Sequence, residues 1–155
     1  MMKIFLALGF PFWAMAQVPQ VMWDRTFGGS SDDFAYQIIP SFNGGYMIGG
    51  ASLSNISGDK SEDNMGDFPY YDYWVVKTDS IGNVQWENTI GGSNFERLKI
   101  VETCPDGGFI LGGESVSGVS GDKTANSYGG SDFWIVKLTG KYNLIDGKLF
   151  VDINN

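Results

Sequence analysis

An internal repeat constrains the fold of this chain more than any other feature. Shifting the sequence by 63 residues, or by 60 near the end of the unit, aligns four motifs in the same order. The motifs are WDRTFGGS at 23–30 with WENTIGGS at 86–93, NGGYMIGG at 43–50 with DGGFILGG at 106–113, SGDK at 57–60 and again at 120–123, and DYWVVK at 72–77 with DFWIVK at 132–137. The chain therefore contains two copies of one structural unit, at residues 23–85 and 86–138.

Each unit is predicted to form short β-strands. Its apolar segments are rich in aromatic and β-branched residues, and its glycine-containing turns at 43–45 and 106–108 favour hairpins. The segments 73–77 and 133–138 are almost continuously apolar, which predicts strands buried on both faces. No segment after residue 16 shows a sustained helical period, so we expect an all-β protein with almost no helix.

The number of units leaves three arrangements open. Four short strands per unit, glycine pairs at the corners and one tryptophan in the inner strand are typical of a β-propeller blade, and propellers use about four to eight blades. One blade needs neighbours to bury its faces, whereas this chain encodes two units and its tail at 139–155 does not begin a third. We expect two propeller-blade-like repeats of antiparallel strands, which form part of a propeller encoded by a longer gene, a ring of several chains, or a small sandwich.

The first sixteen residues have the pattern of a secretory signal peptide. Lys3 gives the positive start, residues 4–13 form an apolar run, and residues 14–16 (AMA) provide a small-x-small cleavage site. An uncleaved anchor is the weaker alternative, because a membrane span needs roughly 20 apolar residues and Pro11 interrupts this run. We expect cleavage after residue 16, a short leader at 17–22, and a mature protein without a membrane span that is secreted or held at the cell surface.

The composition excludes several kinds of site and partner. The chain has no histidine, which rules out a Ser-His-Asp triad and a histidine zinc site. Its formal net charge of −8 argues against nucleic acid as a partner, because phosphates attract a basic surface. Its single cysteine, Cys104, cannot form an internal disulfide. We expect Cys104 to be buried and inert, with a bridge between two chains as the alternative.

The repeated motifs resemble those of secreted, propeller-like repeat proteins of Bacteroidetes. The resemblance covers residues 23–138 and rests on the four motifs together. It implies a propeller-like fold and export, since these proteins often carry a C-terminal sorting domain of the type IX secretion system. The present chain has two units and no recognisable sorting domain after them. The resemblance brings no catalytic residues.

The loop at 55–71 is the richest in candidate ligands for a metal ion. Asp59, Asp63 and Asp67 supply the hard oxygen atoms that calcium prefers. The glycine position and the terminal glutamate of a standard calcium loop are missing, so a solvated loop held by Asx turns is the alternative. The equivalent loop at 118–131 is poorer in carboxylates. We expect both loops to lie on one rim of the molecule, because equivalent loops of stacked repeats share a face.

The aromatic residues are predicted to divide between the core and the loops. The four repeated tryptophans are expected to pack between the units, with an exposed platform for sugars as the alternative: Trp23, Trp74, Trp86 and Trp134. The tyrosines of the long loops are the candidates for stacking on a ligand, because a tyrosine combines a large apolar ring with a polar tip: Tyr70, Tyr71 and Tyr128.

The repeated charged residues have structural interpretations. An Asp at the entrance of a strand, such as Asp72 or Asp132, commonly accepts backbone N–H bonds, and Lys60 and Lys123 are expected to pair with nearby carboxylates. Paired carboxylates can also hydrolyse glycosides, and residues 63–72 contain three aspartates. The sequence thus predicts a non-catalytic binding or structural module, whose partner is a protein or a glycan or a further copy of the chain. A fragment of a propeller-type carbohydrate hydrolase is the alternative.

Overall fold

Nine β-strands form the regular structure of the described residues. The computed structural model describes residues 18–42, 44–140, 142–145 and 148–151, and these contain no helix. The strands are β1 (Asp33–Pro40), β2 (Tyr46–Ser52), β3 (Asp72–Thr78), β4 (Val84–Ile90), β5 (Glu96–Thr103), β6 (Phe109–Ser115), β7 (Asp132–Leu138), β8 (Tyr142–Ile145) and β9 (Lys148–Val151). The expected signal peptide at 1–16 lies outside the described residues. In the part of the chain that is described, no helix is long and apolar enough to cross a membrane.

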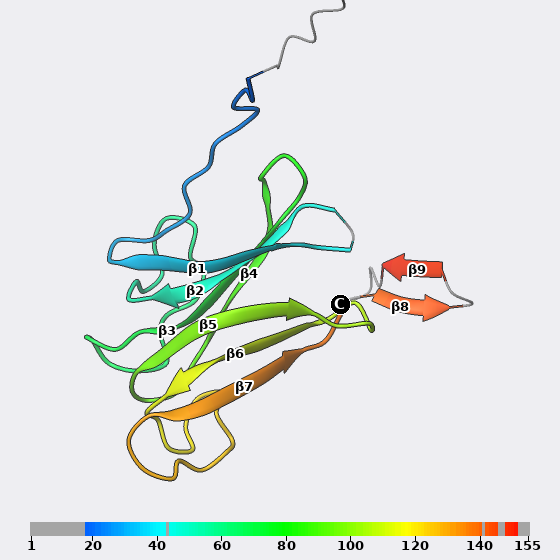
Figure 1. Ribbon diagram of the computed structural model, residues 1–155. Helices are drawn as coiled ribbons and strands as arrows, with labels where there is room; N and C mark the ends of the chain where they lie inside the picture. The colour runs from blue at the N-terminus through cyan, green and yellow to red at the C-terminus, as the bar shows by residue number, and fades with distance from the viewer. Residues whose placement is uncertain (1–17, 43, 141, 146–147, 152–155) are drawn as a thin grey trace, which may run out of the picture.

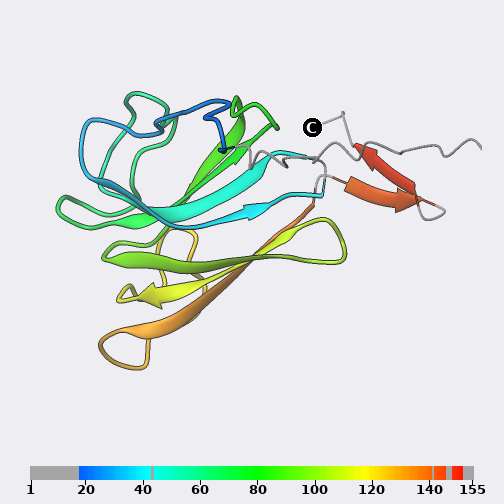
Figure 2. The same cartoon turned by 45° about the horizontal axis from the view of Figure 1, so that its top comes forward.

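Two antiparallel sheets form the body of the molecule. The first sheet has the strand order β1-β2-β3-β4 and the second has the order β5-β6-β7, while β8 and β9 pair with each other. The two sheets lie as separate layers and do not close into a barrel (Figures 1 and 2). The expectation of an all-β protein built from antiparallel strands is confirmed. The arrangement is consistent with a small sandwich or with part of a propeller.

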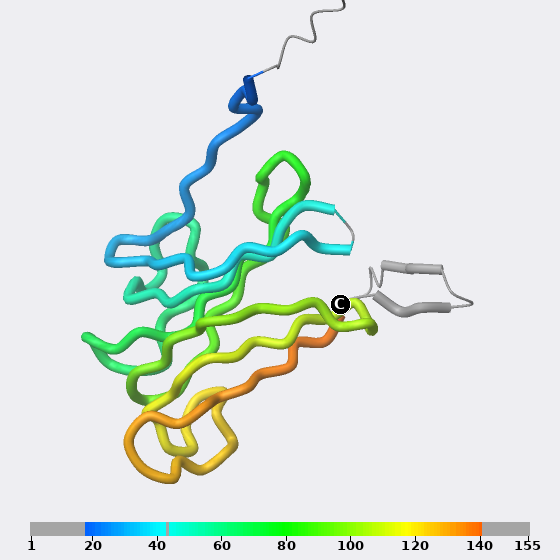
Figure 3. The backbone as a smooth tube through the Cα atoms, viewed as in Figure 1, coloured from blue at the N-terminus to red at the C-terminus, as the bar shows by residue number. Residues whose placement is uncertain are grey.

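The same register recurs in the two sheets. Asp33 pairs with Ser52 at the start of β1, and Glu96 pairs with Ser115 at the equivalent place in β5. Each strand then has an irregularity two residues further on, between Ala35 and Gln37 in β1 and between residues 98 and 100 in β5. The smoothed backbone shows the two hairpins running in similar curves (Figure 3). The local structure of the repeat is therefore set by the unit itself.

The hydrogen-bonded sheet and the sequence unit are offset by one strand. Strand β4 carries Trp86, which opens the second unit in the sequence, yet β4 pairs with β3 of the first unit, with Trp86 opposite Lys77. The equivalent segment at the start of the first unit, residues 21–27, has no strand partner among the described residues and is not a strand. One sequence unit thus supplies the last strand of the sheet formed by the unit before it.

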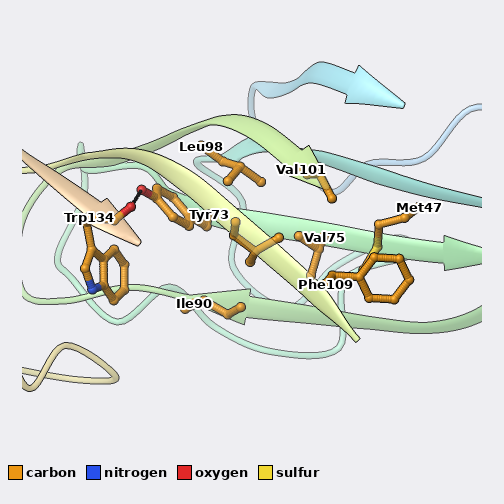
Figure 4. Packing of buried hydrophobic residues seen from close by; sticks show 9 residues of the cluster. Met47, Tyr73, Val75, Ile90, Leu98, Val101, Phe109 and Trp134 are labelled. Carbon is orange, nitrogen blue, oxygen red and sulfur yellow. Dashed lines mark hydrogen bonds between the residues drawn. The ribbon is translucent and has the colours of Figure 1, made fainter. Parts of the chain in front are cut away.

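The core of the protein lies between the two sheets. Its buried members are Met47, Tyr73, Val75, Ile90, Leu98, Val101, Phe109, Leu111 and Trp134, most of which are seen together in Figure 4. The rings of Tyr73 and Trp134 are 5.0 Å apart, and the Tyr73 hydroxyl donates to the Trp134 carbonyl at 3.1 Å. A Cβ atom on Gly49 would lie 2.3 Å from Val101 and 2.7 Å from Leu98. Only glycine at position 49 lets the sheets approach this closely.

The third strands of the two units differ sharply in burial. Every residue of β3 is buried, as the sequence predicts. The same prediction for 133–138 is wrong: Phe133 is 97% exposed and Ile135 is 59% exposed, whereas their equivalents Tyr73 and Val75 are fully buried. The reason is that the second sheet covers one side of β3, while no described segment covers the matching side of β7.

Candidate functional site

A hydrogen-bond network fastens the loop before each sheet to the loop after its second strand. The amide of Gly29 donates to Asp33 at 2.7 Å, and the hydroxyls of Ser52 and Ser54 donate to the same carboxylate. In the second unit the amide of Gly92 donates to Glu96 at 2.8 Å, and the Ser115 hydroxyl donates to it at 2.7 Å. The acidic residue at this position therefore holds the Gly-Gly-Ser motif in both units.

The SGDK motif forms a tight turn that completes this network. In the first unit Asp59 accepts from the amide of Gly28 at 3.2 Å, and its own amide donates to the Gly28 carbonyl at 2.9 Å. Asp122 makes the same two bonds with Gly91. Gly58 has a φ of 56°, a left-handed value that favours glycine. The strongest repeated polar motif is thus explained by the fold.

The two repeated lysines of this motif are buried and bind neutral oxygen atoms. The Lys60 ammonium donates at 2.6 Å to the Glu62 carbonyl and at 2.6 Å to the Thr89 hydroxyl. Lys123 donates to the Ser117 carbonyl at 2.6 Å. Burial lowers the pKa of Lys60, although the nearby carboxylates Glu87 and Asp72 oppose that shift. The expected ion pairs are replaced by hydrogen bonds to carbonyl and hydroxyl groups, and among the described residues neither lysine lies within ion-pair distance of a carboxylate.

The calcium candidates are engaged in the structure of their own loop. Asp59 accepts from Gly28, and Asp63 accepts from the amide of Ile56 at 2.9 Å. Asp67 takes part through its carbonyl, which accepts from the amide of Tyr70 at 3.2 Å. Within the described ranges no three His, Cys, Asp or Glu side chains are grouped as a metal site. Calcium binding by Asp59, Asp63 and Asp67 stays one of two alternatives, and these hydrogen bonds favour the other, a loop held by its own side chains.

The equivalent aspartates Asp72 and Asp132 accept backbone N–H bonds, as expected for the entrance of a strand. Asp72 accepts from the amide of Met65, and Asp132 accepts from the amide of Tyr128 at 2.8 Å. Asp132 also accepts from the Ser127 hydroxyl at 2.7 Å. These bonds lower the pKa of Asp132, which is partly exposed to solvent.

Asp72 faces a second buried carboxyl group, that of Glu96. Both residues are fully buried, and the Glu96 amide donates to the Tyr71 carbonyl at 2.7 Å. Burial is the main cause that raises the pKa of Asp72 to about 7; the Met65 amide opposes the shift, and the carboxyl of Glu96 adds to it. One oxygen of Asp72 has no hydrogen-bond partner among the described residues. This pair lies under the second sheet, so it is unsuited to act on an external substrate.

Sequence reasoning singled out Asp72 but passed over Glu96. The available signal was its alignment with Asp33, which makes the position acidic in both units. The network around Asp33 explains why an acid recurs there. Glu96 also lies close to Asp72 because the two sheets stack on each other. The repeat pattern does not specify this stacking.

The three candidate tyrosines have different surroundings. Tyr71 packs between Phe34 and Phe95, with ring centres 5.9 and 6.0 Å away, so its role is mainly structural. Tyr128 is 95% exposed in the loop of the second unit. Tyr70 is partly exposed and lines a small cavity of about 110 Å³ in the loop of the first unit. Both loops lie at the same side of the molecule, where β2 and β6 end (Figure 1).

The cavity beside Tyr70 has an apolar wall and a polar lining. Phe68 lies beside Tyr70, and the polar lining comes from Ser30, Ser31, Asn55 and Asn64. The Asn64 amide nitrogen donates to the carbonyls of Ser52 and Tyr70, at 2.9 and 3.1 Å, which fixes the orientation of the side chain. Its buried oxygen has no hydrogen-bond partner in the described residues. Asn64 and Phe68 were missed from the sequence, because neither belongs to the repeat.

The tryptophans belong to the packing of the sheets. Trp134 is a core residue and Trp86 packs against the core. Trp74 is buried, and its indole N–H donates to Glu87 at 2.6 Å. Trp23 contacts Tyr46, with ring centres 6.0 Å apart, and lines a cavity of about 420 Å³ on the far side of the first sheet. The expectation of core positions fits three of the four residues.

A further cavity and the single cysteine lie apart from the site beside Tyr70. A cavity of about 510 Å³ lies between the end of β7 and β4, and Glu62, Glu87, Trp86 and Phe109 contribute to its lining. Cys104 is a free thiol that is partly rather than fully buried, which corrects the expectation of complete burial. Its backbone closes the turn before β6 by pairing with Gly108.

A comparison with protein-family models finds no matching family, and a comparison with curated proteins finds no match. The candidate site therefore rests on the geometry of this chain alone: a small cavity beside Tyr70, with an unpaired acceptor on Asn64 and an apolar wall.

Proposed function

We propose that the protein is an exported, non-catalytic binding module that acts at the bacterial cell surface or outside the cell. The binding site is the cavity lined by Asn64, Phe68 and Tyr70. The observation that carries the proposal is the buried Asn64 oxygen, which lacks a donor. A buried acceptor without a partner costs free energy. Asn64 lines the cavity, and a ligand hydroxyl that displaces the atoms covering this oxygen and donates to it would remove the cost.

The chemistry of the cavity favours a glycan over a peptide. A sugar presents hydroxyl donors at its edge and an apolar face of C–H groups. Tyr70 and Phe68 supply aromatic surface for that face, and the Ser30, Ser31 and Asn55 side chains supply further polar groups. The small volume, about 110 Å³, suits one sugar ring or the end of a chain. A pocket built for a helix or strand would need a longer groove.

The repeated polar residues support a binding role over catalysis. Asp33, Asp59, Glu96 and Asp122 are engaged in the networks that hold the loops. The carboxyl pair of Asp72 and Glu96 is covered by the second sheet. The alternative, a fragment of a carbohydrate hydrolase, would draw its acid and base from Asp63 and Asp67.

The binding experiment is a titration of the purified protein with neutral oligosaccharides of cellulose, xylan and chitin, followed by calorimetry. We expect one of these series to bind, and binding to be lost in Asn64→Leu and Tyr70→Ala. Ile81→Ala changes an exposed residue of the β3–β4 turn and should bind like the wild type. Binding that survives both pocket variants but disappears in Tyr128→Ala would overturn this site and place the ligand on the second unit.

Two further measurements test the remaining parts of the proposal. Mass spectrometry of the exported protein should give an N-terminus at Gln17; a mature protein that retains residues 1–16 would contradict the signal peptide. Release of reducing sugar from bound glycans should stay at background in the wild type. Turnover that is lost in the double variant Asp63→Asn and Asp67→Asn, with folding intact, would instead support the hydrolase.

A further inference from the structure

The second sheet has an open apolar face that corresponds to a buried face of the first sheet. Its side chains are Ile100, Ile110, Phe133 and Ile135, all of them exposed. Three of the equivalent residues, Met47, Tyr73 and Val75, are fully buried against the second sheet. A Cβ on Gly112 would meet Ile100 and Ile135, which shows that these two side chains lie together over β6. The second unit thus repeats a packing face that no described segment covers.

The edge of the second sheet is also incomplete. Strand β3 pairs with β2 on one side and with β4 on the other, whereas β7 pairs only with β6 among the described strands. Exposed edges of this kind are templates for the addition of a further strand. The register of β4 on β3 places Trp86 opposite Lys77, Thr89 opposite Trp74 and Ile90 opposite Tyr73.

Residues 21–27 already lie where a preceding sheet would hold its fourth strand. Trp23 contacts Tyr46 with ring centres 6.0 Å apart, just as Trp86 contacts Phe109 at 6.4 Å. The glycines that follow each segment enter the same network, since Gly28 bonds to Asp59 as Gly91 bonds to Asp122. The segment runs along the side of the first sheet that faces away from the second sheet (Figure 2). Residues 21–27 thus occupy the position of the fourth strand of a preceding sheet, but no described segment forms the third strand of that sheet beside them.

A cavity marks the place of that missing strand. It measures about 420 Å³ and lies between residues 23–27 and the far side of the first sheet. Its lining includes Ile38, Tyr46, Ile48 and Trp74. These residues are the equivalents of Val101, Phe109, Leu111 and Trp134, which receive Tyr73 and Val75 in the core. The cavity therefore matches the open face that carries Phe133 and Ile135.

We propose that a second copy of this chain docks head to tail on the second sheet. Residues 21–27 of that copy add to β7 as a fourth strand, and Phe133 and Ile135 enter the cavity beside Trp23 and Trp74 of that copy. The model for this contact, called the template below, is the packing of the first sheet against the second within one chain. A partner of the second sheet must therefore present a surface like the one that the second sheet presents to the first. The present sequence supplies such a face itself.

The template fixes the register of the contact. Trp23 lies opposite Lys137 of the other copy, Thr26 opposite Trp134, and Phe27 opposite Phe133. The contact joins unlike surfaces, so its repetition gives a ring or a filament. With two sheets per chain, closure at about four to eight sheets corresponds to two to four copies. This inference does not depend on the rim cavity, so the two proposals can fail separately.

The first test is the mass of the purified full chain in solution, by sedimentation velocity over a range of concentrations under reducing conditions. We expect a discrete oligomer. Phe133→Asp should weaken the association by roughly 100-fold, because it places an unpaired carboxylate in an apolar contact. Val119→Asp alters another exposed apolar residue, which lies outside the contact, and should leave the oligomer unchanged. Since Phe133 is almost fully exposed, circular dichroism should show that the variant folds.

The second test fixes the register. Both chains carry Cys104→Ser; one also carries Arg25→Cys and the other Ile135→Cys. These positions are equivalent to Asn88 and Val75, which are paired across β4 and β3 within one chain. We expect a disulfide between the two chains, and none when Asp24→Cys replaces Arg25→Cys. A wild type that is monomeric at every concentration would overturn the proposal. An oligomer that withstands Phe133→Asp, or that crosslinks at position 24 rather than 25, would also overturn it.

Discussion

The carboxyl group of Asp72 meets that of Glu96 in the buried interface between the two sheets. Asp72 begins β3 and Glu96 begins β5, so the pair joins the first unit to the second. The equivalent of Asp72 in the second unit, Asp132, is partly exposed and has no such neighbour among the described residues. Identical positions in the repeat therefore have opposite electrostatic surroundings, and the cause is the stacking of one sheet on the other.

The stability of the protein should depend on the protonation of this pair. Asp72 has a pKa of about 7 when folded, against 3.8 when unfolded. Between these values the folded state binds more protons, so the free energy of unfolding should fall as the pH rises from about 4 to about 7. The groups that face Asp72 are Glu96, Lys60 and the Met65 amide. Denaturant unfolding measured from pH 4.5 to 8 checks this slope.

The variant Asp72→Asn should flatten that profile. A neutral amide resembles the protonated carboxyl, so the variant should gain stability over the wild type as the pH rises. The control is Asp132→Asn, whose carboxylate has a lowered pKa when folded. This second variant removes a stabilising effect that is present at neutral pH and lost on acidification. Parallel profiles for the wild type and Asp72→Asn would contradict the raised pKa of Asp72.

The turn of the SGDK motif should tolerate only glycine. Gly121 has a φ of 53°, and a Cβ there would lie 2.6 Å from the Gly91 carbonyl oxygen. Gly121→Ala should lower the free energy of unfolding by about 1–3 kcal/mol. Gly118→Ala, three residues earlier in the same loop, meets nothing within 4 Å and should be nearly neutral. Thermal and denaturant unfolding compare the two variants, and equal losses would argue against the turn as the cause.

Close packing of the sheets should make Gly49 irreplaceable. Gly49→Ala forces a methyl group against Val101 and Leu98 and should cost about 1–3 kcal/mol. At the equivalent Gly112 the nearest atoms belong to the exposed Ile100 and Ile135, which can move. Gly112→Ala should therefore fold with a smaller loss. Its association should nevertheless weaken, because position 112 lies in the proposed contact between copies.

Calcium should have little effect on the stability of the protein. Asp59 and Asp63 already accept backbone N–H bonds, so an ion would have to compete with them. We expect the melting temperature to be the same in millimolar calcium and in EDTA. A rise with calcium that disappears in Asp63→Asn, but persists in Asp122→Asn, would show that the loop at 55–71 is a calcium site after all.

The local structure of the protein could be predicted from its sequence because the same pattern of strands and turns occurs in both units. The positions of the strands, the glycine turns and the absence of helix in the described residues follow from alternation and turn chemistry, which act over a few residues. The role of the SGDK motif is also local to one unit. The sequence predicts that this motif lies in a loop. It does not predict that Asp59 and Asp122 bind residues that lie 31 positions earlier in the chain.

The sequence by itself determined the unit, and the tertiary structure decided what each unit meets. The segments at 72–77 and 132–137 have similar sequences, yet Tyr73 is buried and Phe133 is exposed. The unpaired oxygen of Asn64 belongs to a residue of the loop at 55–71 that the loop at 118–131 does not repeat, so no comparison of the copies could reveal it. The burial of β3, the raised pKa of Asp72 and the open face of the second sheet all depend on which surface lies opposite a residue. That is a property of the stacking of sheets far apart in the chain, which no local pattern encodes.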